Sequence, residues 1–139
     1  MPRTQTASRG EPATPGPADD VVDLLLAQHA RIEEQFLLVT GSTGEARRDA
    51  FDDLVRLLAV HETAEEEIIH PLVRTLPGAG GDDMVDDRLA EERAAKETLV
   101  ALIDGGVDAD GFDTGLLLLR RAVLMHARHE ERYEFPHLR

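Results

Sequence analysis

The sequence predicts an all-α protein, an up-down-up-down antiparallel four-helix bundle with a disordered N-terminal tail. Four long segments carry apolar residues at spacings of three and four, which places those residues on one face of a helix. Short glycine-rich segments separate them, and no alternating pattern typical of a β-strand competes. Long helices joined by short loops pack as antiparallel neighbours, so the bundle follows.

The predicted tail, residues 1–18, differs in composition from the rest of the chain. It holds four of the seven prolines, mixed with Thr, Ser and Gly, and segments of this kind bury too little apolar surface to fold. We therefore expect a disordered Pro-rich tail and one helical domain over residues 19–139. A chain of 139 residues is long enough to bury a core without covalent cross-links.

The first two helices are predicted over about residues 19–40 and 45–76. Asp19 or Asp20 caps the first helix, because an Asp side chain accepts hydrogen bonds from the free amides of a first turn. Pro71 is expected to kink the second helix, since proline lacks the backbone N–H. The predicted inward positions are Val22, Leu25, His29, Ile32 and Phe36 on the first helix, and Phe51, Leu54, Leu58, His61, Glu65, Ile68 and Leu72 on the second.

The third helix is predicted over about residues 82–104, after a turn at residues 77–81. The fourth begins at a cap formed by Asp113 or Thr114 and ends near Pro136. The predicted inward positions are Val85, Leu89, Glu92, Lys96, Leu99 and Ile103 on the third helix, and Leu116, Leu119, Val123, His126, Glu130, Tyr133 and His137 on the fourth.

An eleven-residue pattern occurs twice, at residues 61–71 and 126–136. Both copies have His at the first place, a Glu-Glu pair at the fifth and sixth, and Pro at the eleventh. In each copy His and the first Glu are four residues apart, so the two side chains lie one turn apart on the same face and can reach one ion.

Titratable side chains interrupt the apolar face of every predicted helix near its middle, where the four helices meet at one depth. Burying a carboxylate without a partner costs several kcal/mol, so three converging carboxylates require compensating cations. Mixed imidazole and carboxylate ligands indicate two metal ions, iron first and manganese or zinc next, bridged by carboxylates and by oxide or hydroxide. The candidate ligands are His29, His61, Glu65, Glu92, His126 and Glu130.

Ordinary structural roles compete with metal binding at several of these positions. A lone core His such as His29 is more often hydrogen-bonded than a ligand, and one HxxxE pair is commonly a surface contact; two such pairs on inward faces favour metal. Glu62, Lys96 and His129 are candidates for additional or supporting roles. Surface or supporting positions are expected for His70, His129 and His137, and a solvated face for Glu66, Glu67, Glu131 and Arg132.

Charge and composition exclude several classes of partner. The formal net charge of -13 repels phosphate backbones and anionic lipids, so neither nucleic acid nor a membrane is expected to bind. The absence of cysteine excludes thiolate sites and fits a reducing compartment. No apolar run approaches the roughly 20 residues that span a bilayer. We expect a cytoplasmic protein.

With these motifs, residues 19–139 resemble a hemerythrin-like, or HHE cation-binding, domain. Two HxxxEE units followed by Pro, with a His upstream, carry the resemblance. It implies a bundle that binds non-haem iron and responds to or processes dioxygen, nitric oxide or peroxide. By this resemblance the ligands are His29 from the first helix, His61 and Glu65 from the second, and His126 and Glu130 from the fourth.

The third helix departs from the family pattern, which offers at least one His there. Residues 90–96 contain none; Glu92 stands at the expected position and Lys96 follows one turn later. If Glu92 ligates, the site has three His and three Glu, and the extra anion favours the ferric state and oxidation or peroxide chemistry over reversible oxygen carriage. If Lys96 pairs with Glu92, the second metal is weakly held or missing.

Three functions follow as hypotheses. The first is a di-iron protein that binds, senses or reduces dioxygen, peroxide or nitric oxide; as an enzyme it would be an oxygen- or peroxide-dependent oxidoreductase. The second is a metal-dependent oxygenase or tailoring enzyme acting on a small organic substrate in a pocket beside the metals. The third is a non-enzymatic iron sensor or store. Small residues that leave space for a substrate are Ala30, Ala64, Ala94, Ala95 and Ala127.

Overall fold

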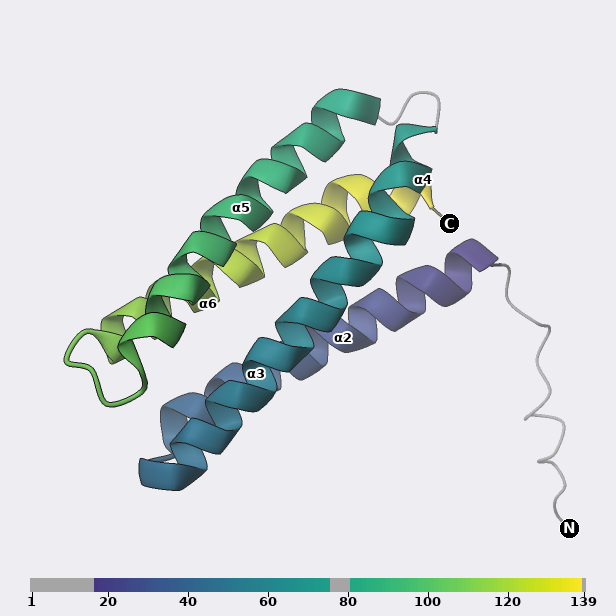
Figure 1. Ribbon diagram of the computed structural model, residues 1–139. Coiled ribbons are helices and arrows are strands. Elements are labelled where there is room, and N and C mark those ends of the chain that lie inside the picture. The colour runs from purple at the N-terminus through teal and green to yellow at the C-terminus, as the bar shows by residue number, and fades with distance from the viewer. Residues whose placement is uncertain (1–16, 76–80, 139) are drawn as a thin grey trace, which may run out of the picture.

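The computed structural model describes residues 17–75 and 81–138, and these residues form a four-helix bundle (Figure 1). The all-α prediction is confirmed, and the described residues contain no strand. Residues 77–80 of the predicted turn and most of the predicted tail lie outside the described residues, whereas Gly81, predicted in the turn, is the first residue of α5. The helical segments are α2 (Pro17–Gly41), α3 (Gly44–Ala64), η1 (Glu65–Ile69), α4 (His70–Arg74), α5 (Gly81–Gly105), α6 (Phe112–His129), η2 (Glu130–Glu134) and η3 (Phe135–His137).

The chain runs up and down between the two ends of the bundle. The α2–α3 and α5–α6 connections lie at one end, and the C-terminus lies near α4 at the other (Figure 1). Helix α2 packs along α3, α5 packs along α6, and contacts between α2 and α6 and between α4 and α5 join the two pairs. Gly44 and Gly106, at the two connections, have φ of 60° and 83°, a left-handed conformation that glycine adopts without steric cost.

The core consists of two apolar clusters with a polar layer between them. One cluster fills the end that holds the α2–α3 and α5–α6 connections, and the other fills the end near α4. The first contains Ile32, Phe36, Val39, Phe51, Leu54, Leu102, Val107, Phe112, Leu116 and Leu119. The second contains Val22, Leu25, Ile69, Val73, Val85, Phe135 and Leu138. Along every helix the candidate ligands fall between these two sets.

Both eleven-residue repeats contain a π-helical turn. The His70 N–H donates to the Glu65 carbonyl, and the Phe135 N–H donates to the Glu130 carbonyl, so each bond spans five residues instead of four. The prolines at the ends of the repeats remove a donor at the next position. The break expected at Pro71 therefore takes the form of a wide turn just before it.

The π turn changes which residues face the core, and the sequence prediction was wrong beyond it. Ile69 is buried, with 1% of its surface exposed, whereas Ile68, predicted to point inward, is 53% exposed. Val73 likewise replaces Leu72 in the core. The fourth helix shows the same shift, because the predicted inward residues Tyr133 and His137 are exposed and Glu134, Phe135 and Leu138 are buried.

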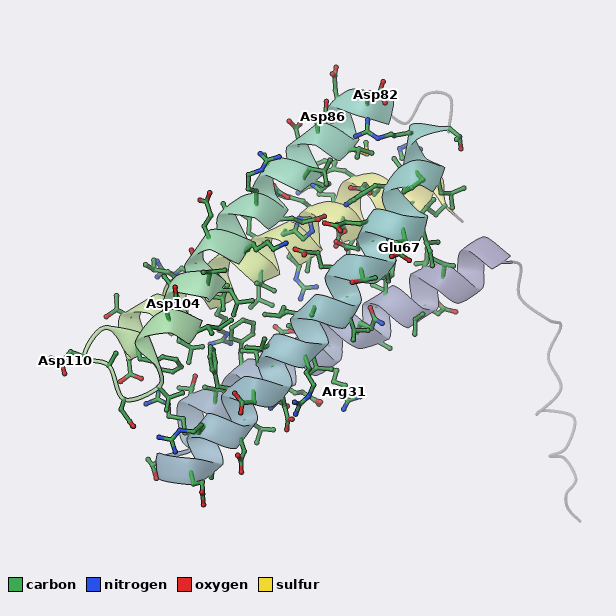
Figure 2. The ribbon with its side chains drawn as sticks, viewed as in Figure 1. Arg31, Glu67, Asp82, Asp86, Asp104 and Asp110 are labelled. Carbon is green, nitrogen blue, oxygen red and sulfur yellow. The ribbon has the colours of Figure 1, made fainter. Side chains whose placement is uncertain are left out.

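Other expectations are also corrected. On α5, Lys96 and Ile103 are exposed and Leu102 is buried, so the inward face is rotated from the predicted one. The exposed side of α5 carries acidic residues such as Asp82 and Asp86 (Figure 2). The N-cap of α6 is Gly111, which has no side chain to cap with, and not Asp113 or Thr114. Helix α2 begins at Pro17, inside the predicted tail. None of the described helices is long and apolar enough to cross a membrane.

The π turn in the first repeat predicts unequal effects of substituting two neighbouring isoleucines. Ile69→Ala should lower the free energy of unfolding by about 2–5 kcal/mol, because it leaves a cavity in the apolar cluster near α4. Ile68→Ala should change it by less than about 0.5 kcal/mol, because that side chain is largely in solvent. Urea unfolding of both variants at equal metal content measures this; a larger loss for Ile68→Ala than for Ile69→Ala would show that an ordinary α-helix continues through the repeat.

Candidate metal centre

The six candidate ligands come together in the polar layer. Each of the four helices of the bundle supplies one or two of them, where η1 continues α3 and η2 continues α6. Helix α2 supplies one, α3 and η1 supply two, α5 supplies one, and α6 and η2 supply two. All six side chains are buried, and the glutamates from the two repeats are almost completely enclosed. They are His29, His61, Glu65, Glu92, His126 and Glu130.

Their donor atoms form two overlapping groups. Within each group one ligand atom per residue lies within 4.8 Å of the others, which is close enough for a shared cation. Both groups contain Glu65 and Glu130, so these two carboxylates lie between the two positions. The first group is His29, His61, Glu65 and Glu130, and the second is Glu65, Glu92, His126 and Glu130.

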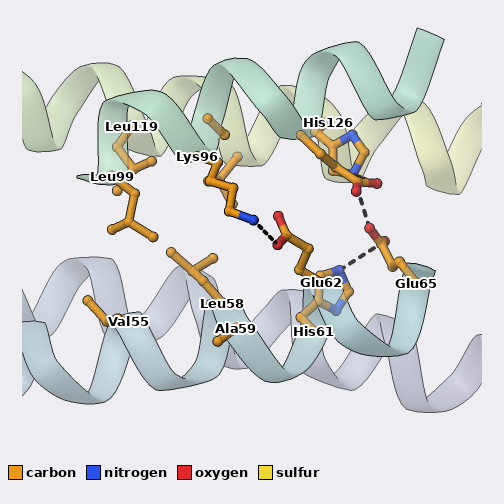
Figure 3. A pocket seen from close by; sticks show the side chains of 13 residues that line it. Val55, Leu58, Ala59, His61, Glu62, Glu65, Lys96, Leu99, Leu119 and His126 are labelled. Carbon is orange, nitrogen blue, oxygen red and sulfur yellow. Dashed lines mark hydrogen bonds and ion pairs between the residues drawn. The ribbon is translucent and has the colours of Figure 1, made fainter. Parts of the chain in front are cut away.

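The Nε2 atoms of the three histidines face the two shared carboxylates. His61 Nε2 lies 3.0 Å from Glu65 Oε2, and His29 Nε2 lies 3.2 Å from Glu130 Oε1. His126 Nε2 lies 3.2 Å from Glu65 Oε1 and 3.5 Å from Glu130 Oε2. Figure 3 shows His61, Glu65 and His126 pointing toward one another from opposite sides of the bundle.

The opposite nitrogen of each histidine is held by an acceptor. Nδ1 donates to Glu131 Oε2 from His29 (2.7 Å), to Gln28 Oε1 from His61 (2.7 Å) and to Glu91 Oε1 from His126 (2.9 Å). A proton fixed on Nδ1 leaves Nε2 available for a metal, and such outer partners usually orient metal-binding histidines. Sequence analysis did not identify these three partners, and it assigned Glu131 only to a solvated face.

The residues present fit a metal ion. With Nδ1 protonated, the neutral rings of His29 and His61 turn their Nε2 lone pairs toward each other across 3.2 Å, which requires a proton or cation between them. Glu65 Oε2, Glu92 Oε1 and both carboxylate oxygens of Glu130 are buried and make no hydrogen bond. Leaving buried polar atoms unpaired is costly, and metal ligation would satisfy them.

Protonation compensates part of this charge in the metal-free protein. Burial and the neighbouring Glu65 raise the pKa of Glu130 well above its usual range. Burial also acts to raise the pKa of Glu65, but its close contacts with the carboxyl of Glu130 and the imidazoles of His126 and His61 hold it well below its usual range. Burial acts to lower the pKa of His126, yet its hydrogen bonds with Glu65 and Glu92 raise it to about 10. A proton on Glu130 and one on His126 thus occupy places that a metal would take.

Comparison with known families gives one match. The family model of the hemerythrin HHE cation-binding domain matches residues 20–138, nearly all of the described chain. The chain belongs to the hemerythrin HHE family. Comparisons with curated proteins and with solved structures gave no match. The domain binds metal cations by family, and its buried His and Glu groups could hold them.

In this HHE domain the third helix contributes a carboxylate, and Lys96 does not neutralise it. Lys96 Nζ lies 3.4 Å from Glu62 Oε1, on the opposite wall of a cavity (Figure 3). Glu92 instead accepts a hydrogen bond of 2.6 Å from His70 Nε2. Glu62 and Glu92 also form a further acidic group with Glu66 at the edge of the centre. The Lys96–Glu92 ion pair, which the sequence analysis gave as one alternative, is therefore not formed.

His70 and Glu134 make a second buried polar cluster that sequence analysis missed. His70 was expected at the surface but is buried, and its Nδ1 lies 3.9 Å from Glu134 Oε2. Burial acts to lower the pKa of His70, but its hydrogen bond with Glu92 raises it. Burial raises the pKa of Glu134 to about 7 although His70 acts against this. The π turns bring both residues inward, and the prolines that follow were the only sequence signal.

The remaining candidates lie at the rim. His129 Nδ1 donates to Glu91, the carboxylate that also holds His126, so His129 supports the centre indirectly. Glu62 is half-buried and lines the cavity beside His61. His137 is exposed.

A cavity of about 160 Å³ opens onto the second group of ligands. Glu65, Glu92 and His126 line one side of it together with His61, the Lys96–Glu62 ion pair lies next to them, and apolar side chains of α3, α5 and α6 line the rest. Of the alanines predicted to leave space, Ala95 lines this cavity, while Ala30 and Ala94 are exposed elsewhere. Small molecules can therefore approach the ligands from this side.

Because His126 and Glu130 bind protons in the metal-free protein, we expect the affinity for metal to rise with pH. Both His126 and Glu130 have raised pKa values, so a divalent ion must displace their protons, and this becomes easier as pH increases. We expect at least tenfold tighter zinc binding at pH 8 than at pH 6. Calorimetry in buffers of different ionisation enthalpy should show protons released on binding, and pH-independent affinity without proton release would contradict this assignment.

The raised pKa of Glu134 predicts a pH-dependent stability in the metal-free protein. A carboxyl whose pKa rises from its ordinary value to about 7 on folding stabilises the folded state at low pH, and this stabilisation is lost as pH rises toward 7. Glu134→Gln should therefore raise the free energy of unfolding by about 1–3 kcal/mol at pH 8 and change it little at pH 4. Urea unfolding measures this, with the exposed Glu67→Gln as control.

Proposed function

We propose that this HHE domain is a non-haem di-iron protein that binds, senses or reduces dioxygen, peroxide or nitric oxide. The observation that carries the proposal is the pair of four-residue groups that share Glu65 and Glu130. Two carboxylates common to both groups suit bridging between two ions, and each group retains its own imidazole.

Charge supports two divalent ions. Three glutamates carry three negative charges and two divalent ions carry four positive ones, which leaves one positive charge for an oxide, hydroxide or further carboxylate to cancel. One ion would be held by His29 and His61 and the other by His126 and Glu92, with Glu65 and Glu130 between them. Iron bound there would supply the binding and stepwise reduction of small oxygen or nitrogen species.

The donor set favours iron, with manganese next. It combines imidazole nitrogens with hard carboxylate oxygens, and it has no thiolate or thioether. The second group has one imidazole and three carboxylates, so it is richer in anions than the first. Anionic ligands stabilise the higher oxidation state, which favours oxidation or peroxide chemistry over reversible oxygen carriage.

The protein side chains have three tasks in this function. Glu91, Glu131 and Gln28 hold the three imidazoles so that Nε2 would be free to bind the ions. His70 donates a hydrogen bond that orients the Glu92 carboxylate. The apolar wall of the cavity excludes water from one side of the second group while leaving a path for a small molecule.

The cavity also favours a second candidate function, a metal-dependent oxygenase acting on a small organic molecule. Its volume of about 160 Å³ is well below the roughly 300–1,000 Å³ of pockets that bind drug-sized ligands. Only a compact organic substrate would therefore fit in this cavity.

Iron loading tests the first function. Protein loaded anaerobically with ferrous iron should hold close to two irons per chain, because the centre has two groups of donors. Exposure to oxygen or peroxide should then produce an oxo-iron absorption band. A chain that holds two irons but gives neither a band nor turnover would overturn the oxygen and peroxide function while leaving the metal site intact.

Variants separate the two positions. Glu65→Ala should remove both irons, since this carboxylate belongs to both groups, whereas Glu92→Ala should lower the stoichiometry toward one. Lys96→Met should keep two irons, because Lys96 pairs with Glu62 and not with Glu92. The exposed Glu67→Ala is the matched control. Elemental analysis measures each ratio, and two irons in Glu65→Ala would contradict the bridging role.

A further inference from the structure

The cavity beside the centre has an apolar chamber and a polar wall. Val55 and Leu58 of α3, Leu99 of α5, and Leu119 and Val123 of α6 form the chamber. In Figure 3 the chamber residues Val55, Leu99 and Leu119 lie on one side, His61, Glu65 and His126 lie on the other, and the Lys96–Glu62 ion pair lies between them. A bound molecule would therefore have one end among hydrocarbon side chains and the other end at the ligands.

We propose that this cavity binds a small organic molecule with a compact alkyl or cyclic body and one neutral oxygen head group, an alcohol or a hydroperoxide. The body occupies the apolar chamber, and the head faces Glu65, Glu92 and His126. The proposal names a ligand class for the proposed function, and it rests on that function only for the metal behind the polar wall.

The volume limits the size of the body. An apolar cavity of about 150 Å³ accepts a molecule the size of benzene and stays dry when empty. The whole cavity, from the apolar chamber to the polar wall, has a comparable volume of about 160 Å³, so a molecule of six or seven non-hydrogen atoms, head group included, fills it. Each additional CH₂ buried in such a site should tighten binding about fourfold until the space is full.

The charges of the lining select the head group. Among the described residues that line the cavity, Lys96 is the one Lys or Arg, and its ammonium is already paired with Glu62. Beyond this pair the wall of the metal-free protein carries the carboxylates of Glu65 and Glu92, which leave it net negative even with His126 protonated and so disfavour an anionic head. A hydroxyl or hydroperoxide can donate to a carboxylate without adding charge.

The ion pair also provides the entrance. Ala59 and Lys96 line the cavity and are exposed, so the cavity reaches the surface between α3 and α5. The Lys96 side chain is 62% exposed, and exposed ion pairs contribute little to stability. The pair can therefore separate at low cost to admit a molecule.

A series of alcohols tests the size limit. Ligand-observed NMR would measure the dissociation constants of ethanol, tert-butanol, cyclohexanol and 1-adamantanol with metal-free and zinc-loaded protein. We expect affinity to rise at least tenfold from ethanol to cyclohexanol and to fall again for 1-adamantanol, whose eleven non-hydrogen atoms exceed the space. Pivalate should bind the metal-free protein at least tenfold more weakly than tert-butanol. Affinity that does not depend on alkyl size, or equal binding of pivalate, would overturn the proposal.

Two substitutions on the same helix locate the binding. Val55→Phe places a ring in the chamber and should weaken cyclohexanol at least tenfold, whereas Val60→Phe, at a position 61% exposed, should leave it within twofold. If Val55→Phe does not fold, Ala95→Leu fills the same space from α5. Zinc stoichiometry is measured on every variant. If cyclohexanol binding is unchanged in a folded Val55→Phe or Ala95→Leu variant, the proposed binding in this cavity is rejected and the metal function is untouched. If the wild-type protein binds no zinc, the proposed metal function is rejected and the cavity proposal is untouched.

Discussion

The convergence of Glu65 and Glu130 is the constraint on which the centre depends. Both carboxylates are enclosed in the middle of the bundle, with oxygens that no hydrogen bond satisfies. Apolar clusters above and below prevent them from turning toward solvent. The protein must therefore supply positive charge at this depth, as protons in the metal-free state or as metal ions, and the three surrounding imidazoles serve either state.

The π turns explain how far the sequence could predict this arrangement. Up to Glu65 and Glu130 each repeat has the ordinary helical period, and so do α2 around His29 and α5 around Glu92, so the six residues could be proposed as candidate ligands from spacing alone. Past those residues each π turn inserts one extra residue into the turn, and every later side chain moves to the next position around the axis. That shift explains why Ile69 and Glu134 are buried where Ile68 and Tyr133 were expected. Hydrophobic periodicity assumes a constant period and cannot contain such a step.

The partners that orient the imidazoles were beyond sequence reasoning for a different reason. Gln28, Glu91 and Glu131 lie beside the core faces of their helices, where polar side chains are ordinarily solvated. Each becomes a partner only because a histidine from another helix reaches it across the packed bundle. Packing between helices decides such contacts, and no single-helix pattern encodes them.

Packing between helices also accounts for the departure from the family pattern on α5, where Glu92 stands at the position expected for a His. A carboxylate at position 92 would be poorly fixed if it lacked a partner, because both its oxygens lie in the buried layer. The π turn before Pro71 turns His70 inward from α4, and its Nε2–H reaches Glu92 at 2.6 Å. The imidazole of His70 thus lies beside this part of the centre, but it orients Glu92 through a hydrogen bond and is not itself a candidate ligand. The Glu92 carboxylate faces the shared glutamates, Glu65 and Glu130. The Glu at position 92 of α5 and the π turn before His70 therefore act together. Their combined effect is a centre with more negative charge on the side that faces the cavity.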